Sequence, residues 1–524
     1  MNNDIIQSLT GTRPVYGVQM KYKLLKSSVF IGCSFFIGSI FAADEKPDIK
    51  SGGGTTVYST GTNAFSLPSK NIDIMKRLDF SVGNSFFKNP WVIAPSSTDA
   101  RDGLGPLFNT NGCQSCHIRD GRGHAPSGPE DSAVSMLVRL SVETPEGVFP
   151  EPVYGGQLQD FAIPGVKPEG RISVSYTSKT VTYPDGEKVE LRIPHLEIKD
   201  LGYGPMHPKA QFSSRIATPM IGLGLLEAIK AEDILAQADP DDKNGDGISG
   251  RANEVLDHET HEPTLGRFGW KAGQPNVRQQ NASAFNGDLG IDSHLFPKDD
   301  CTEAQKACLE APNGRMPVVK NDYNNKKGHH SGEHDGKEHH GKPEHGKGEH
   351  GPQEGLFNLK EEPMELSNKI LNFVTFYAKN LGVPARRNAD DPQVIKGETL
   401  FSEINCSSCH TPSYTTGEDA EMPWLANQKI YPYSDMLLHD MGEDLADHRP
   451  EAQANGFEWR TQPLWGIGLT EVVSGVANYL HDGRAETIEE AILWHGGEAE
   501  ASKKEFMALK KEDREAVLAF LKSL

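Results

Sequence analysis

Cys113-Gln114-Ser115-Cys116-His117 and Cys406-Ser407-Ser408-Cys409-His410 are two copies of the pattern CxxCH. Two thiols three residues apart can bond to the two vinyl groups of one haem, and the adjacent histidine can then ligate the iron. A single copy would also fit a redox dithiol or half of a zinc site. Because each copy follows a Leu-Phe pair at the same distance, Leu107-Phe108 and Leu400-Phe401, we interpret each as the attachment site of one c-type haem.

The Leu-Phe pairs fit the first helix of a small cytochrome c fold, whose apolar side chains pack on the porphyrin edge. We therefore expect a mainly α fold with two cytochrome c-like domains, short β decorations and long inserted loops. β-Branched content at 138–140, 171–176 and 189–193 predicts the strands, and residues 223–235 predict a helix. An apolar stripe at 365–381 predicts another helix, and the amphipathic helix expected at 512–521 is suited to packing on the first helix of the second domain.

The composition and the N-terminal sequence indicate which partners and which cellular location to expect. The chain has 524 residues and a formal net charge of -20, which argues against nucleic acid as a partner and for a soluble protein. A basic segment at 20–26 precedes an apolar run at 29–41 that ends at Ala42-Ala43, the pattern of a cleaved secretory signal. We expect residues 1–43 to be a signal peptide, with Met20 as an alternative start, and the protein to be periplasmic. An uncleaved anchor and a lipidated Cys33 are the alternatives.

The cysteines agree with export. The chain has seven, and removal of the signal leaves the four of the CxxCH motifs together with Cys301 and Cys308. In an oxidising compartment the last two are expected to form a disulfide across a short loop.

Composition also divides the chain. Residues 44–75 are rich in Gly, Ser and Thr and are expected to be a flexible leader, 76–320 an N-terminal haem domain with inserts, 321–360 a histidine-rich low-complexity insert, and 361–524 a C-terminal cytochrome c-like haem domain. Seven of the nineteen histidines lie within 326–351. Capture of transition metals by these imidazoles and a solvated linker are both open interpretations.

An internal repeat extends beyond the haem motifs. Residues 219–225, PMIGLGL, match residues 463–469, PLWGIGL. Glu227 and Glu471 follow at equal distances, and Arg215 and Arg460 lie just upstream. The repeat indicates two haem units with a common plan, of which the first has gained inserts.

Longer stretches also stand out: RIATPMIGLGLLEAI, NGDGISGRAN, GRFGWKAGQPNVRQQNASAF, PYSDMLLHDMG, EWRTQPLWGIGL and LHDGRAETIEEAILWHGGEA. Through them the chain from about Leu78 to Leu524, the histidine-rich insert excepted, resembles the di-haem oxidoreductases once labelled predicted thiol oxidoreductases. The thiol label has no support, since no free reactive cysteine pair remains. More distantly, the family is similar to bacterial di-haem cytochrome c peroxidases and to the di-haem enzyme that matures methylamine dehydrogenase.

The resemblance implies an electron-transfer haem in the C-terminal domain and a peroxide-reacting haem in the N-terminal one. In the peroxidases a distal methionine follows an HDG motif, and the same interval from His481 leads to His495, which we expect to ligate the second haem. Imidazole would lower the potential relative to a thioether. The alternative is a buried helical histidine beside Trp494. The interval from Pro463 to His495, applied to Pro219, leads to Arg251, so the N-terminal iron is expected to be open unless His258 or His261 reaches it.

Two further sites are hypotheses. Glu227 is the candidate for moving a proton and stabilising charge at peroxide, and a helix-terminal carboxylate is the alternative. The relatives' glutamine and glutamate around FWDGRA have no clear counterpart in this half, which puts classical peroxidase activity in doubt. Asp242, Asn244 and Asp246 have the spacing of a calcium loop, but Asn253 replaces the usual glutamate, and an Asx-rich turn is equally open.

Together these features predict a periplasmic oxidoreductase with two covalently bound c-type haems. It would pass electrons from a small cytochrome or cupredoxin through the C-terminal haem to a small-molecule oxidant, a peroxide, at the N-terminal haem. One alternative is an electron carrier or metal reductase with two six-coordinate haems that serves metal uptake or respiration. Another is a metal-binding accessory protein in which the histidine tract acts.

Overall fold

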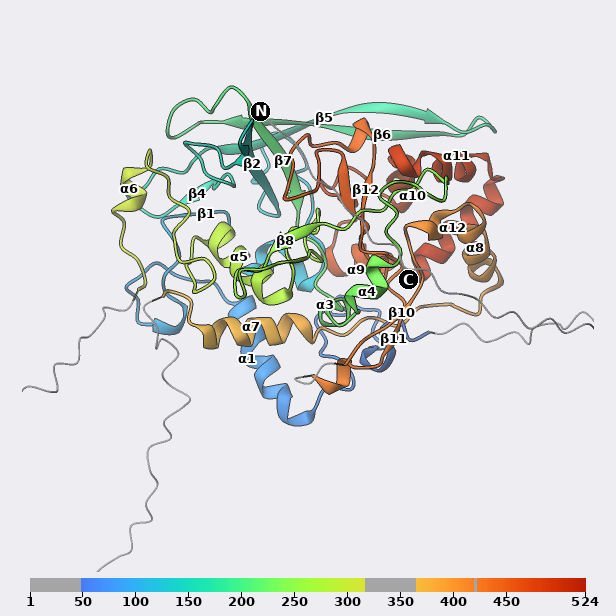
Figure 1. Ribbon diagram of the computed structural model, residues 1–524, viewed down its shortest axis with the longest axis horizontal. Helices are drawn as coiled ribbons and strands as arrows, with labels where there is room; N and C mark the ends of the chain where they lie inside the picture. Colours follow the sequence, from blue (N-terminus) through green and yellow to red (C-terminus); the bar gives the residue numbers. More distant parts are fainter. Residues whose placement is uncertain (1–48, 316–363, 419–421) are drawn as a thin grey trace, which may run out of the picture. The chain divides into compact units, whose positions relative to one another are not determined.

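The computed structural model describes residues 49–315, 364–418 and 422–524 (Figure 1). Of the described residues, 30% are helical and 19% lie in strands that are divided among several small sheets. The expectation of a mainly α fold is therefore wrong, and cytochrome c-like domains are not shown. Strands expected to be short decorations pair over much longer stretches, because the polar residues between their β-branched runs also join the ladders.

Within the described residues the α-helices are α1 (Arg77–Lys88), α2 (Cys113–Cys116), α3 (Leu223–Glu227), α4 (Ala231–Leu235), α5 (Val277–Leu289), α6 (Lys306–Leu309), α7 (Asn368–Lys379), α8 (Pro392–Glu403), α9 (Thr470–Ser474), α10 (Ile488–Leu493), α11 (Glu500–Ala508) and α12 (Lys511–Ser523). The strands are β1 (Leu107–Phe108), β2 (Met136–Thr144), β3 (Gly147–Phe149), β4 (Phe161–Ala162), β5 (Arg171–Thr182), β6 (Lys188–Lys199), β7 (Ala210–Ile216), β8 (Glu254–Leu256), β9 (Pro263–Leu265), β10 (Tyr414–Thr415), β11 (Lys429–Ile430), β12 (Leu438–Asp440) and β13 (Glu458–Arg460).

The two Leu-Phe pairs lie in different structures. Leu400 and Phe401 are part of α8, as expected, but Leu107 and Phe108 form β1, which pairs with β4. The helix expected at 223–235 is also divided into α3 and α4, because Lys230 between them is extended, with φ -64° and ψ 140°. The helices expected at 365–381 and 512–521 are confirmed as α7 and α12.

The largest β element is the antiparallel hairpin β5–β6, in which Arg171 pairs with Lys199 and Thr182 with Lys188. Figure 1 shows it reaching from the sheet β3-β2-β7 to the helices α10 to α12. At its tip Tyr183 is 2% exposed and packs in the same apolar cluster as Phe506 and Phe520. Arg514 of α12 binds both tip carboxylates, at 2.8 Å from Asp185 and 2.7 Å from Glu187. The hairpin therefore ties the first half of the chain to its C-terminal helices.

Two helix pairs support the CxxCH segments. α7 packs on α1, with the Tyr377 ring 4.8 Å from that of Phe80 and 5.3 Å from that of Phe87. α12 packs on α8, where the Phe401 and Phe520 rings lie 5.2 Å apart. The first pair joins a helix from the expected C-terminal domain to the first CxxCH segment. The boundary between the two expected domains stays a prediction.

The expected flexible leader is packed where the structure describes it. Phe65 is 2% exposed within the main core, and the Val57 amide donates to the Val383 carbonyl at 2.9 Å. Gly, Ser and Thr here supply turns and backbone hydrogen bonds rather than a disordered linker. The predicted signal peptide and the histidine-rich residues 326–351 lie outside the described residues. Among the described helices, none has the length and apolar character needed to cross a bilayer.

The internal repeat packs against itself. Gly222 and Gly466 occupy equivalent positions, and both have positive φ, 69° and 74°. A Cβ on Gly222 would lie 2.4 Å from the Trp465 ring, and one on Gly466 would lie 2.7 Å from Ile221 Cδ1. Because Ile221 and Trp465 are themselves equivalent, each repeat fills the space left by the glycine of the other. The two copies of the repeat are therefore in direct contact.

Candidate functional site

The first CxxCH segment lines a cavity of about 210 Å³, called here the N-terminal pocket. α2 supplies Cys113 and Cys116, and His117 follows at its C-terminal end. Both thiols are free. The remaining wall is largely apolar and comes from α1, β2, α5, the first repeat and the segment before α5, including Phe87, Met136, Phe285, Met220 and Phe268.

The second CxxCH segment lines a cavity of about 190 Å³, the C-terminal pocket. Cys406 and Cys409 are free thiols in and just after a short 3-10 turn, and His410 follows. His495, from the end of α10, lines the same cavity. Apolar residues of α8, α10 and α12 complete the wall, among them Phe401, Ile492, Val517 and Leu521.

The histidines share one arrangement. His117 Nδ1 lies 2.8 Å from the Thr218 carbonyl, His410 Nδ1 lies 2.9 Å from the Tyr433 carbonyl, and His495 Nδ1 lies 2.7 Å from the Ala491 carbonyl. Since a carbonyl accepts, each Nδ1 carries the proton and donates. Each Nε2 then retains its lone pair, which is the tautomer that a metal-ligating imidazole requires.

Burial keeps these imidazoles neutral. It lowers the pKa of His117 and that of His410 to about 4, outweighing the carbonyl acceptors, which act in the opposite direction. Burial also lowers the pKa of His495, and His495 itself contributes to the low pKa of His410, as expected of two imidazoles in one pocket. A proton would not compete for Nε2 at neutral pH.

The thiols do not resemble a redox dithiol. Burial raises the pKa of Cys113 and that of Cys406 to about 12 and also raises the pKa of Cys116 and Cys409. Reactive dithiols show the opposite shift, because their chemistry needs a thiolate near neutral pH. Protonated thiols beside a neutral imidazole in an apolar cavity fit a haem that is bonded through its vinyl groups.

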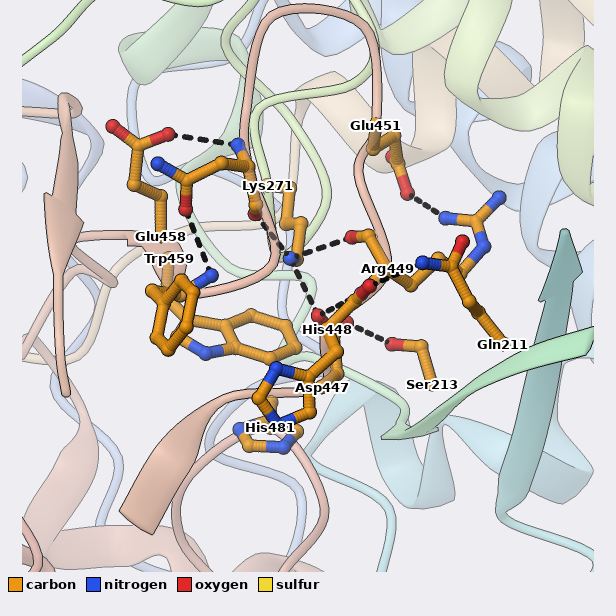
Figure 2. Close-up of polar contacts among 12 residues, drawn as sticks. Gln211, Ser213, Lys271, Asp447, His448, Arg449, Glu451, Glu458, Trp459 and His481 are labelled. Atoms are coloured by element: carbon orange, nitrogen blue, oxygen red, sulfur yellow. Dashed lines mark hydrogen bonds and ion pairs between the residues drawn. The ribbon is translucent and has the colours of Figure 1, made fainter. Parts of the chain in front are cut away.

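A buried charge network adjoins the N-terminal pocket (Figure 2). Arg215 Nη1 lies 2.8 Å from Glu451 Oε2, and both residues line the pocket. Lys271, 0% exposed, lies 2.7 Å from Asp447 Oδ1. Burial alone would raise the pKa of Glu451, but the guanidinium groups of Arg215 and Arg449 outweigh it and hold that pKa well below its usual range. Glu451 is therefore a fixed negative charge.

The network reaches the C-terminal pocket through an aromatic pair. The Trp459 ring stacks on the imidazole of His481 with centroids 3.8 Å apart and planes at 11°, as Figure 2 shows beside Lys271 and Asp447. Trp459 and His481 line the C-terminal pocket. Burial lowers the pKa of His481 to about 4, so this ring is neutral and stacked.

A sequence comparison agrees with this double site. The family model described as "Di-haem oxidoreductase, putative peroxidase" matches residues 47–325 and 358–524. The chain belongs to this family. The resemblance drawn from the motifs is thereby confirmed, and with it two haems as cofactors and an oxidoreductase function. The unmatched residues 326–357 contain the histidine-rich tract. A search of curated proteins found no match.

In this di-haem oxidoreductase Glu227 lies apart from both pockets. Its Oε2 accepts a hydrogen bond of 2.7 Å from the Val277 amide at the start of α5, and its Oε1 lies 2.5 Å from Lys379 Nζ. It is not among the residues that line either cavity in the described part of the chain. The structure thus places Glu227 as a helix-terminal carboxylate, and its proposed catalytic role stays a prediction.

The calcium loop expected in this oxidoreductase forms internal hydrogen bonds. Asp246 N donates to Asn244 Oδ1 at 2.9 Å, and Ile248 N donates to Asp246 Oδ1 at 2.9 Å. These are the bonds of Asx turns. Asn253, at the position of the usual glutamate, is buried and donates to the Lys271 carbonyl. Calcium binding stays a prediction.

The structure also shows where the remaining residues singled out in the sequence lie. Cys301 and Cys308 form a disulfide with Cα atoms 5.8 Å apart. His258 and His261 line neither pocket among the described residues. Arg215 and Arg460, noted in the repeat, both line the N-terminal pocket.

Several lining residues had no signal of their own in the sequence. Arg122, Arg139, Gln157, Asp288 and Glu451 all line the N-terminal pocket. They come from distant parts of the chain, and only the folded structure brings them together. Trp270 lies in a motif that indicated the family, but the motif did not predict that this ring would line the pocket.

Proposed function

We propose that the protein covalently binds one c-type haem in each pocket and reduces a peroxide at the N-terminal one. Cys113, Cys116 and His117 would hold the first haem, with His117 available to the iron, and Cys406, Cys409 and His410 would hold the second. The support is the donor set described above, in which free thiols and a neutral imidazole with an available Nε2 line each apolar cavity.

The observation that distinguishes the two sites is the number of imidazoles. Four histidines line the C-terminal pocket, but His439 is bound through both ring nitrogens by Asp435 and Glu498, and His481 stacks on Trp459. His410 and His495 remain as the candidate ligands there, whereas His117 is the one histidine among the described residues that line the N-terminal pocket. Two neutral imidazoles suit a six-coordinate electron-transfer haem. A single imidazole would leave the iron a coordination position for the substrate. When bound, the haems would pass on electrons from a donor one at a time, and two electrons would be needed to reduce each peroxide bond.

The N-terminal pocket contains a residue that could donate the proton needed for peroxide reduction. Asp288 Oδ1 accepts a 2.8 Å hydrogen bond from Gln157 Nε2, and Gln157 Oε1 accepts one of 3.1 Å from Arg139. Burial raises the pKa of Asp288, which favours a proton on its other oxygen, Oδ2. We propose that Asp288 donates this proton and that Arg139 and Arg215 stabilise the charge that separates.

The same geometry supports transfer between the sites. Trp270 lines both pockets, and its Nε1 donates to the Ile216 carbonyl at 2.9 Å, which fixes the ring between them. An external donor, such as a small cytochrome or cupredoxin, would deliver electrons to the C-terminal haem. The signal-like sequence at 20–43 supports a periplasmic location, where such donors operate.

Rapid mixing of the half-reduced protein with hydrogen peroxide tests this proposal. The wild type should be oxidised rapidly. Asp288→Asn, which keeps the acceptor for Gln157, should slow the peroxide step by roughly 10²–10⁴-fold without preventing cyanide binding. Glu227→Gln is the comparison, because Glu227 is also a partly buried carboxylate but lies outside the pocket. A slow Glu227→Gln beside a normal Asp288→Asn would return the proton-transfer role to Glu227.

One observation favours the electron-carrier alternative. Met136 and Met220 also line the N-terminal pocket, and a thioether can supply a sixth ligand. In that case the half-reduced protein would neither bind cyanide nor react with peroxide. A methionine-to-iron charge-transfer band in the absorption spectrum, lost in Met136→Leu or Met220→Leu, would identify that ligand.

A further inference from the structure

Two buried arginines belong to both pockets. Arg122 follows the first CxxCH motif, and Arg460 ends β13 upstream of the second copy of the repeat. Each is 6% exposed, and each lines the N-terminal and the C-terminal pocket. Arg122 also lies 5.6 Å from the ring of Trp270, which lines both pockets as well. These two cations therefore stand between the sites.

Both arginines have hydrogen-bond donors without acceptors. Arg122 Nε and Nη1 and Arg460 Nη1 are buried and unpartnered in the described structure. The other donors of Arg460 are used, since Nε donates to the Gly269 carbonyl at 3.0 Å and Nη2 to Gln462 Oε1 at 2.7 Å. The free donors are thus specific atoms of side chains that are otherwise held in place.

Neither arginine forms an ion pair among the described residues, in contrast to its neighbours. Arg215 and Arg449 both pair with Glu451, at 2.8 and 2.9 Å. Burial lowers the pKa of Arg122 and that of Arg460 to about 10, so both remain charged at neutral pH. A buried charge without a counterion is costly, and a folded protein compensates it with an anion.

The chemistry of the pockets indicates which anion. Each haem bears two propionate groups, and a carboxylate matches the planar fork of a guanidinium group. We propose that Arg122 and Arg460 form a shared anion site that binds propionates of both haems and couples the two haems electrostatically. This inference rests on the proposed occupation of both pockets by haem. The shared site would couple the two haems in a way that neither CxxCH motif does, because each arginine charge would act on both irons.

The coupling has a definite sign. A cation beside a propionate neutralises its charge, and this favours the reduced, more electron-rich iron. Removing a shared cation should lower the reduction potentials of both haems. Removing a cation that lines one pocket should lower the potential of that haem alone. Arg139 supplies this comparison, because it lines the N-terminal pocket and not the C-terminal one.

Spectroelectrochemical titration of the purified holoprotein tests the inference. Arg122→Gln and Arg460→Gln should each lower both midpoint potentials. Arg139→Gln should shift the N-terminal haem only. Arg386→Gln, at a buried arginine outside both pockets that pairs with Glu398 at 2.8 Å, should shift neither. Unchanged potentials in both shared-site variants, or a shift confined to one haem, would overturn the proposal. Haem content is measured first by the pyridine assay. Fewer than two c-type haems in the wild type would refute the proposed function itself.

Two measurements on the wild type keep the test valid even if a variant folds poorly. Infrared spectra with isotope-labelled propionates should show ionised carboxylates across the neutral range, since the guanidinium groups favour that form. A large protonated fraction at both haems would contradict the inference. Added phosphate should not change the potentials. A phosphate-dependent shift that Arg122→Gln abolishes would mean that the arginines bind a free anion instead.

Discussion

At the scale of single residues, His495 illustrates what a sequence motif can predict about a site. Its Nδ1 donates to the Ala491 carbonyl, its Nε2 is not used in that bond, and it lines the same pocket as His410. Counting along a family motif led to this residue, because the spacing from an HDG motif depends on a short local segment; its role as an iron ligand stays a prediction. The same counting could not find Arg122, because only the folded structure shows that this residue lines both pockets.

The first prediction concerns this ligand. His495→Gly should remove the sixth ligand of the C-terminal haem, so that its ferric low-spin signal is lost and added imidazole restores it. His495→Met should remain low spin with a higher potential, since thioether sulfur favours ferrous iron. His481→Gln is the control, because His481 lines the same pocket but stacks on Trp459. Low-spin spectra retained in His495→Gly and lost in His481→Gln would reverse the assignment.

The second prediction concerns pH and stability. Burial raises the pKa of Asp160 to about 7, although the 2.9 Å hydrogen bond from Asn109 Nδ2 acts in the opposite direction. The folded state therefore holds a proton that the unfolded state loses near pH 4, so the unfolding free energy should fall as pH rises from about 4 to about 7. This carboxyl contributes a slope of at most about 1.4 kcal/mol per pH unit.

Asp160→Asn should reduce that slope, because the amide keeps the acceptor and cannot ionise. Urea unfolding followed by circular dichroism at a series of pH values measures it. Asp131→Asn is the control, since hydrogen bonds from Ser127 lower the pKa of Asp131 and place its titration below this window. An unchanged slope in Asp160→Asn would show that Asp160 ionises normally in the folded protein.

At the scale of elements, the repeat explains how the two sites are joined. Equivalent glycines at 222 and 466 accept equivalent side chains, Trp465 and Ile221, from the opposite copy. The sequence predicted the repeat but not this contact, because matching residues show a common plan and not that the copies meet. The local pattern was similarly insufficient at Leu107-Phe108. A helix was expected there, but these residues form a strand that pairs with β4.

The third prediction tests the repeat contact. Gly222→Ala should destabilise the protein by roughly 3 kcal/mol or more, because it combines a positive φ with a clash against Trp465. Gly475→Ala is the matched control. Gly475 has φ 83° and ψ -12°, against 69° and 11° at Gly222, and a Cβ there meets nothing within 4 Å. It should cost only about 1 kcal/mol. Equal losses in thermal unfolding would show that the contact is unimportant.

At the scale of the whole molecule, the sequence predicted the family and two haem segments but not the fold class. The CxxCH motifs and their histidines are local, and short segments specify them. The fraction of strand depends on pairing between distant segments, such as β2 with β7 and β12 with β13. The hairpin β5–β6 similarly extends beyond its β-branched runs because its tip packs on α12.

The fourth prediction concerns the histidine-rich tract. Its composition cannot build a core, and the family match omits it. Deletion of residues 326–350 should leave the melting temperature and haem spectra nearly unchanged and lower the number of bound copper, nickel or zinc ions. Mass spectrometry of the metal-loaded protein counts those ions. Loss of haem incorporation on deletion would show that the tract is needed for folding.

The central claim is that one haem has two histidine ligands and the other has one, with an open position. Electron paramagnetic resonance of the oxidised and half-reduced protein, with and without cyanide, tests it most directly. We predict a low-spin bis-histidine signal from the C-terminal haem when oxidised, and cyanide binding at one haem per chain, the N-terminal one, in at least one of the two states. Two six-coordinate low-spin haems in both states, without cyanide binding, would contradict it.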